Sequence, residues 1–382
     1  MVTVFTFLLF TFAFENMAYN LKTRDNLPDF IRLVKWNCRL ASAGGAYHYS
    51  LCGLLLRLRQ LYKWEHGMHP WQEPDPDAVL AWVAEQEKVW ESLEDAPWQP
   101  LTLGGATFEP QDVDGVNTLL LPLGLAYGAG LSRGLKPTFF LGELAEVRRE
   151  GELTILILAK ELARDLDGTP ALCQGSLIYA RHEAMGFYVW DRLADPVQQN
   201  NEFLKIALAG HGLKLKSLLR DPGAHETQFR NLVAAELEAA IHHEIGEARE
   251  RSLRQALPAI LASFPQTRVE HWARGLKDAL AEVNESGRLS YLIKNRNLPS
   301  LALMLAWRPG LYGLLMPELE PACRRVAAKG DWDALEEARA RVLARLRSTA
   351  LGLTELMANR ETTSSHDTLK DIENRYLIPI GL

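Results

Sequence analysis

The sequence has little of what marks several large classes of protein, beginning with cysteine. Its 382 residues include only four cysteines, which lie far apart and form no CxxC pair. Isolated cysteines are typical of small buried side chains in a reducing compartment, and not of a disulfide framework. We therefore expect a cytoplasmic protein.

Positive charge is also in the minority. Lysine and arginine number 42 against 48 aspartate and glutamate, which gives a formal net charge of -6. Proteins that bind nucleic acid usually carry a basic face. We therefore expect no nucleic-acid partner. The sequence identifies no other partner, and it leaves a homo-oligomer open.

No apolar segment has the length of a membrane span without interruption. A spanning helix needs about 20 apolar residues, and residues 298–315, which come closest, contain Arg308 and Pro309. Residues 2–14 are apolar but too short, and they lack the basic start and the cleavage site of a signal peptide. We expect no stable membrane insertion.

Met17 follows this first apolar segment and begins a polar stretch. We interpret residues 1–20 as a leader that is either disordered or the product of a mis-assigned start codon, with Met17 as the true first residue. Residues 1–16 are then expected to add nothing to the fold. An uncleaved membrane anchor is the alternative.

Two common catalytic signatures are missing as well. No GK[ST] follows the glycine-rich segment 124–134, and no GxSxG occurs. This segment follows a helical pattern and not a strand, so it does not match a dinucleotide fingerprint. We interpret it as a flexible loop over a pocket, and we assign no residue to an organic cofactor.

What the sequence does contain is the composition of a globular protein, with 47% hydrophobic and 24% charged residues. Apolar spacing predicts a helical N-terminal unit over residues 21–99, in which Gly44 and Gly45 end the first helix. Its helices are expected at 27–43, 47–66 and about 75–94.

Residues 100–195 are expected to form a small α+β unit. The pattern indicates a helix at 113–127, strands at 138–148, 152–159 and 176–180, and a helix at 182–193. The second strand is apolar on both faces, which favours a buried strand. Glu161 and Asp165 follow it, and we expect Lys160 and Arg164 to neutralise them at the surface.

Residues 196–358 show helical spacing throughout and predict a C-terminal helical bundle, followed by a tail at 359–382. Within the tail, residues 362–367 are interpreted as a linker and the last seven residues as an extended arm. The predicted fold class is mainly α (α+β). Helices of the bundle are expected at 201–219, 224–250, 252–263, 266–284, 298–306, 317–329 and 331–357.

One stretch of this bundle, residues 225–250, gathers polar residues that have chemical potential. On a helix, each residue turns about 100°, so His225, Glu236, His243 and Glu247 fall on one stripe. Glu244 falls in the apolar arc beside it. A carboxylate on that face of the helix is expected to be buried, and a buried carboxylate must be paired, protonated or bound to a metal.

The pattern HExxE at 243–247 suggests a metal site. Residues four apart share one face of a helix, so His243 and Glu247 can bind one divalent ion, either zinc or iron. Glu244 then resembles the general base of an HExxH helix. Glu236 and His225 are candidate further ligands on the same stripe. Remaining ligands are expected from His211, His182 or the Glu65–His69 cluster.

These patterns leave two classes of function open. The first is a metal-dependent hydrolase or oxidoreductase with Glu244 as the catalytic residue, and the second is a helical interaction or scaffold protein in which the same residues form a buried polar network. A metal-free acid–base site is a further alternative. The sequence does not establish that the protein is an enzyme.

Three segments carry a resemblance to other proteins: LYKWEHG at 61–67, GSLIYARHE at 175–183 and HHEIGE at 242–247. They resemble a family of uncharacterised bacterial proteins, over about residues 21–355. The resemblance implies a stably folded family and no particular activity.

Overall fold

A computed structural model describes residues 26–382, apart from residues 94, 133–135, 308–309 and 359–363. The expectations for residues 1–20, for Gly134 and for the start of the linker at 362–367 lie outside the described residues. The chain divides into two compact units. The first comprises the described residues up to Gln174 together with Tyr179–Trp190, and the second comprises Gly175–Ile178 and Asp191–Leu382.

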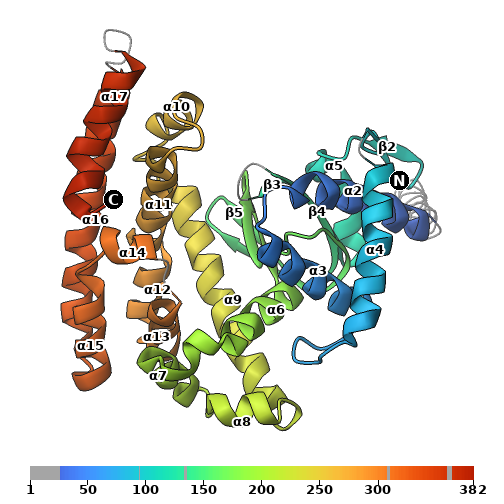
Figure 1. The fold of residues 1–382 in the computed structure, drawn as a ribbon, viewed down its shortest axis with the longest axis horizontal. Coiled ribbons are helices and arrows are strands. Elements are labelled where there is room, and N and C mark those ends of the chain that lie inside the picture. The colour runs from blue at the N-terminus through green and yellow to red at the C-terminus, as the bar shows by residue number, and fades with distance from the viewer. Residues whose placement is uncertain (1–25, 94, 133–135, 308–309, 359–363) are drawn as a thin grey trace, which may run out of the picture. The chain divides into compact units, whose positions relative to one another are not determined.

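The first unit begins with three helices, which Figure 1 labels. Ser50 and Asp75 cap the second and third, because their side chains accept hydrogen bonds from the backbone N–H three residues on. The predicted end of the first helix at Gly44 was wrong. The helix continues past both glycines because its buried face offsets their helix cost of about 1 kcal/mol each. The helices are α2 (Leu27–Ala46), α3 (Leu51–Glu65) and α4 (Pro76–Ser92).

A five-stranded sheet follows, in the order β3-β4-β5-β7-β6, with β3, β4 and β5 antiparallel. The two strands before it, β1 (Leu101–Leu103) and β2 (Ala106–Phe108), form a separate two-stranded sheet. The remaining elements are α5 (Val113–Leu120), β3 (Leu125–Ser132), β4 (Lys136–Glu150), β5 (Leu153–Arg164), β6 (Ala171–Gln174), β7 (Leu177–Arg181) and α6 (His182–Ala194).

The glycine-rich segment is a strand, β3, and not the loop we expected. Its glycines make room for side chains of two other strands, β4 and β6. A Cβ at Gly128 would lie 2.1 Å from the Phe140 ring, and a Cβ at Gly130 would lie equally close to Gln174. The predicted helix at 113–127 accordingly ends at Leu120, where a short 3₁₀ turn leads into the strand.

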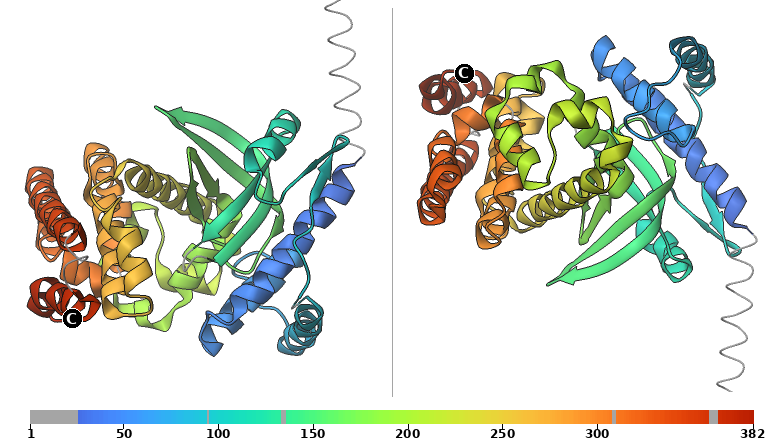
Figure 2. Two further views of the ribbon diagram at one scale, coloured as in Figure 1. Left: turned by 90° about the horizontal axis from the view of Figure 1, so that it is seen from above. Right: turned by 90° about the horizontal axis from the view of Figure 1, so that it is seen from below.

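Helix α2 packs across β4 and β5, as both views in Figure 2 show. The core beneath it is apolar and joins residues of α2, β1, α5 and the sheet. The N-terminal helix and the sheet therefore share one hydrophobic core.

The second unit is helical and has a large apolar core of its own. Three short helices, α12, α14 and α17, were not predicted, and α17 begins at Ser365 within the expected linker, so the linker was wrong there. The single helix expected at 201–219 is divided into α7 and α8. The helices are α7 (Glu202–Gly210), α8 (Leu215–Arg220), α9 (Glu226–Arg249), α10 (Ala256–Ser263), α11 (Arg268–Val283), α12 (Arg288–Lys294), α13 (Leu298–Ala306), α14 (Gly310–Leu315), α15 (Leu319–Lys329), α16 (Trp332–Ala358) and α17 (Ser365–Ile372).

The end of the chain is helical, so the predicted extended arm was wrong. Helical turns continue from α17 through Ile380. Leu377 is only 1% exposed within the core of the unit, and the Tyr376 ring stacks on Trp272 at 5.5 Å between centroids. The C-terminal residues therefore pack on the second unit through the apolar face of a helix, and not as a strand.

The predicted fold class, mainly α with a small sheet, is confirmed. Among the described helices, none combines the length and the apolar character that crossing a membrane requires.

Candidate metal centre

The candidate centre lies in the second unit, between the neighbouring helices α9 and α11. Apolar residues along α9, among them Leu237, Ile241 and Ile245, are buried and hold this helix in the unit. Glu226 in its first turn and Arg249 in its last have the charges that a helix dipole favours at those ends. Helix α11 is capped by Thr267, whose hydroxyl accepts a hydrogen bond from the Glu270 N–H.

Three potential metal ligands come together where these helices are close. His243, Glu247 and Asp278 each offer one ligand atom, and these atoms all lie within 4.8 Å of one another. All three side chains are half-buried. Among the described residues, no other cluster of three histidine, cysteine or acidic side chains meets this distance.

Glu282 and Arg288 surround His243 with charge. The Nδ1 atom of His243 lies 3.2 Å from a carboxylate oxygen of Glu282, and Arg288 pairs with the same carboxylate. Burial raises the pKa of Glu282, but the charges of Arg288 and His243 outweigh this effect and lower it to about 2. For His243, burial has the opposite effect and lowers the pKa, because it disfavours the charged form, but Glu282 raises this pKa to about 9. Without a metal, His243 is therefore a cation paired with Glu282.

The other two carboxylates are also in a charged environment. The Lys277 Nζ lies 2.5 Å from a carboxylate oxygen of Glu247. Burial raises the pKa of Asp278, against the lowering effect of the charges on His243 and Lys277. A divalent cation would oppose this effect of burial by favouring the ionised form of Asp278, and it would compete with Lys277 for the charge of Glu247.

The upper limit on the spacing of the three ligand atoms is close to what a metal needs. Ligands at about 2.0–2.1 Å from a tetrahedral zinc lie roughly 3.3 Å from one another. Ligand atoms separated by up to 4.8 Å would reach this spacing if side-chain rotation moved each of them by about 1 Å. A histidine and two carboxylates fit zinc or iron(II), and three protein ligands leave one position open for water or substrate.

Two models of one family match the chain. The N-terminal domain of a family of unknown function, DUF6866, matches residues 29–181, and its C-terminal domain matches residues 186–375. The chain belongs to this family. The border between the two matches falls close to the division between the two compact units. Searches of curated proteins and of solved structures found no match.

In the DUF6866 C-terminal domain, the structure brings together two of the residues that the sequence singled out, His243 and Glu247. Glu236 and His225 are not part of the 4.8 Å group. Glu236 is buried on α9 with Ser300 among its neighbours, and His225 stands at the start of that helix. Asp278 comes from α11 and was not anticipated, nor was Glu282.

The expected burial of Glu244 was wrong in degree. Glu244 is half-buried, whereas Glu236 is only 7% exposed. The charge of Glu244 nevertheless raises the pKa of His243, which places it near the group. A signal for Glu282 was present, since it follows Ala279, Leu280 and Ala281 in an apolar run. Asp278 stands one turn before it on the same helix face.

Of the ligands expected from elsewhere, His211 is half-buried at the end of α7, outside the 4.8 Å group, and burial lowers its pKa. His182 and the Glu65–His69 cluster belong to the first compact unit and not to the second, which contains the candidate centre. In the first unit, the His66 ring bonds the Tyr62 carbonyl oxygen at 2.8 Å, which is the common role of a histidine at a helix end.

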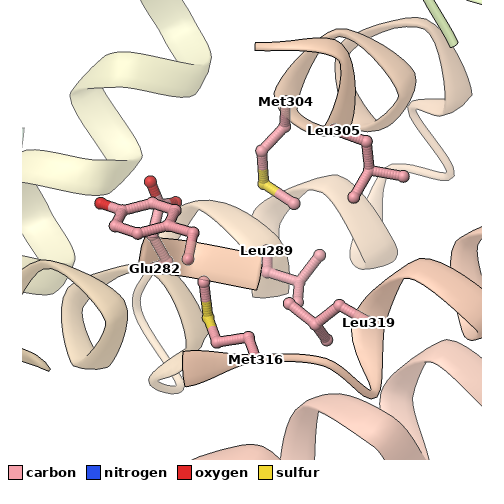
Figure 3. A pocket seen from close by; sticks show the side chains of 7 residues that line it. Glu282, Leu289, Met304, Leu305, Met316 and Leu319 are labelled. Carbon is pink, nitrogen blue, oxygen red and sulfur yellow. The ribbon is translucent and has the colours of Figure 1, made fainter. Parts of the chain in front are cut away.

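Glu282 also borders a small cavity, which Figure 3 shows together with Met304, Met316 and Leu319. The cavity measures about 10 Å³ and its lining is mostly apolar. It has room for about one water molecule and none for a substrate. Any substrate of the candidate centre would have to reach the three half-buried ligands by a route other than this cavity.

Proposed function

We propose that the DUF6866 C-terminal domain binds one divalent metal ion, zinc or iron, through His243, Glu247 and Asp278. The observation that carries this proposal is the approach of three ligand atoms to within 4.8 Å across two helices. Glu282 then acts on the outer side of His243, where its carboxylate lies 3.2 Å from Nδ1 and orients the ring by charge pairing. That arrangement leaves Nε2 as the nitrogen for the metal.

The chemistry that best suits this set is metal-dependent hydrolysis. A divalent ion with three protein ligands lowers the pKa of a bound water and polarises a substrate carbonyl or phosphoryl oxygen. Glu244 is the candidate base, because it is half-buried beside His243 and is not itself within the ligand group. Its role would be to accept a proton from the attacking water.

A second candidate is a non-enzymatic scaffold in which the same residues form a polar network. Two contacts favour it, because Lys277 pairs with Glu247 and Arg288 pairs with Glu282. With both pairs formed, these two carboxylates have a cationic partner even when no metal is bound.

Metal analysis of the full chain, purified without an affinity tag, separates these candidates. We expect about one zinc or iron per chain, lost in His243→Ala and in Asp278→Asn. His242→Ala is the matched control, because His242 stacks on Tyr291 and pairs with Glu238 instead. Absence of stoichiometric metal, even after incubation with excess zinc or iron(II), would reject the proposal and leave the scaffold.

Glu244→Gln tests the catalytic role separately. We expect it to retain the metal and the thermal midpoint, while it abolishes hydrolysis of generic p-nitrophenyl esters and phosphates by the metal-loaded chain. Loss of metal in this variant would make Glu244 a ligand and remove its assignment as the base.

A further inference from the structure

The N-terminal domain contains a cavity of about 500 Å³ that the candidate metal centre does not involve. This volume is within the range of about 300–1,000 Å³ that is usual for small-molecule sites. Its walls come from α2, α3, α4, β5 and the start of α6, all within the first unit. The residues that matter below are Lys35, Arg39, Trp64, Gln86, Trp90, Lys160, Glu161, Arg164 and Glu183.

The cationic side chains of this cavity have unused binding capacity. Lys35, Arg39 and Lys160 are exposed and form no ion pair among the described residues. Arg164 is only 4% exposed, and its Nε has no hydrogen-bond partner in the described part of the chain. A buried donor without a partner costs about 1–3 kcal/mol, so an acceptor bound in the cavity would relieve this cost.

The carboxylates of the cavity are already engaged. Glu161 accepts a hydrogen bond from Arg181 Nε at 2.6 Å, and Glu183 accepts one from the Glu161 backbone N–H at 2.6 Å. A third carboxylate, Glu65, accepts from the indole N–H of Trp82 at 3.0 Å. The groups left for a ligand are therefore mainly cationic, which favours an anion.

Two tryptophans give the cavity flat apolar surfaces. Trp64 and Trp90 are half-buried at its wall, and the Arg164 guanidinium lies 5.8 Å from the Trp64 ring centroid. Tryptophan faces stack well on heteroaromatic rings, with about 1–3 kcal/mol per stacked base. The half-buried amide of Gln86 can both donate to and accept from the edge of such a ring.

We propose that this cavity binds a phosphorylated heteroaromatic small molecule of the nucleoside monophosphate class. The phosphate would pair with Lys35, Arg39 and Lys160, while the ring would lie against Trp64 and Trp90. Inorganic phosphate alone would fill only a small part of about 500 Å³. The cavity has no P-loop, so this mode of binding uses side chains and not a glycine-rich backbone cradle.

The test is titration of the full chain with AMP, GMP, CMP and UMP, followed by tryptophan fluorescence and by calorimetry. At least one of the four is expected to bind with a Kd below about 1 mM. Arg39→Ala and Lys160→Ala should each weaken binding about tenfold, the equivalent of about 1.4 kcal/mol. Arg32→Ala is the matched control, since Arg32 is exposed on the same helix and pairs with Asp29.

Trp64→Leu and Trp90→Leu test the ring, each checked for an unchanged thermal midpoint. At least one correctly folded variant of this pair should lose affinity for the nucleotide. Binding of inorganic phosphate as tight as that of the best nucleotide would overturn the ring assignment. No binding of any of the four nucleotides, or full binding by an Arg39→Ala/Lys160→Ala double variant, would overturn the proposal.

Discussion

Gly246 of α9 lies directly against the backbone carbonyl oxygen of Ala281 in α11. A Cβ at residue 246 would be 2.2 Å from that oxygen and 2.8 Å from the Cα of Gly287. The side-chain amide of Asn284 donates to the Gly246 carbonyl oxygen at 2.8 Å and fastens the same crossing. This backbone contact brings His243 and Glu247 within reach of Asp278.

Gly246→Ala is therefore expected to force the two helices apart. Overpacking of this kind costs about 1–3 kcal/mol, which corresponds to a fall of several degrees in the thermal midpoint. Metal affinity should fall with it, because the ligands come from both helices. The control is Gly310→Ala at the exposed start of α14, where a Cβ has nothing within 4 Å. Equal midpoints for the two variants would contradict this account of the crossing.

Lys277 and a metal ion compete for the same carboxylate, that of Glu247. Lys277→Met should tighten zinc binding at the proposed centre about fivefold, since a partly exposed ion pair contributes up to about 1 kcal/mol. Competition with a chromogenic chelator at pH 8 measures the change. Lys294→Met, at an exposed position on α12, should leave affinity as it is. Weaker binding in Lys277→Met would show that the lysine supports the site.

The candidate site could be predicted from the sequence only in part, and Glu244 and Asp278 show why. Helical spacing correctly placed His243 beside Glu247, because that relationship lies within one helix. The partner Asp278 depends on which helix packs against α9, and that choice is fixed by a close approach at Gly246 which no spacing rule contains. The position of Glu244 among the apolar residues of α9 suggested burial, yet Glu236 is the buried carboxylate and Glu244 is only half-buried.

The fold shows the same division between local and tertiary causes. Long helices such as α9 and α16 were predicted within a few residues, because runs of helix-favouring residues are a local signal. Strand β3 was missed because glycines carry no such signal. The glycines of this strand are explained by tertiary contacts, because the side chains of Phe140 and Gln174 fill the space over Gly128 and Gly130. Asp165 and Arg164 were expected at the surface, but both are buried.

Glu161 and Arg181 form a buried ion pair in the N-terminal domain, with Arg181 wholly buried and Glu161 3% exposed. Glu161→Gln leaves the buried arginine without its ion-pair partner, so we expect a loss of about 3–5 kcal/mol in the free energy of unfolding. Urea denaturation measures it. Glu85→Gln breaks the exposed pair with Lys88 and should cost less than about 1 kcal/mol. A similar small cost for both variants would refute the prediction.

The last prediction concerns pH and the buried Glu236. Burial raises its pKa to about 7, although Ser300 and the charge of Arg288 both lower it. Between its ordinary value of 4.5 and about 7, the folded chain holds a proton that the unfolded chain releases. The contribution of Glu236 to the free energy of unfolding therefore falls as pH rises through this window, and it is constant above about pH 7.

Glu236→Gln should remove this dependence. The variant and the original chain are expected to differ little at pH 4, whereas at pH 8 the variant should be more stable by up to about 3 kcal/mol. Urea denaturation at half-unit steps of pH gives the difference curve. Glu337→Gln, at an exposed carboxylate of α16, should give a flat curve. If the Glu236→Gln difference is equally flat, Glu236 is already ionised in the folded chain, and a cation must neutralise it there.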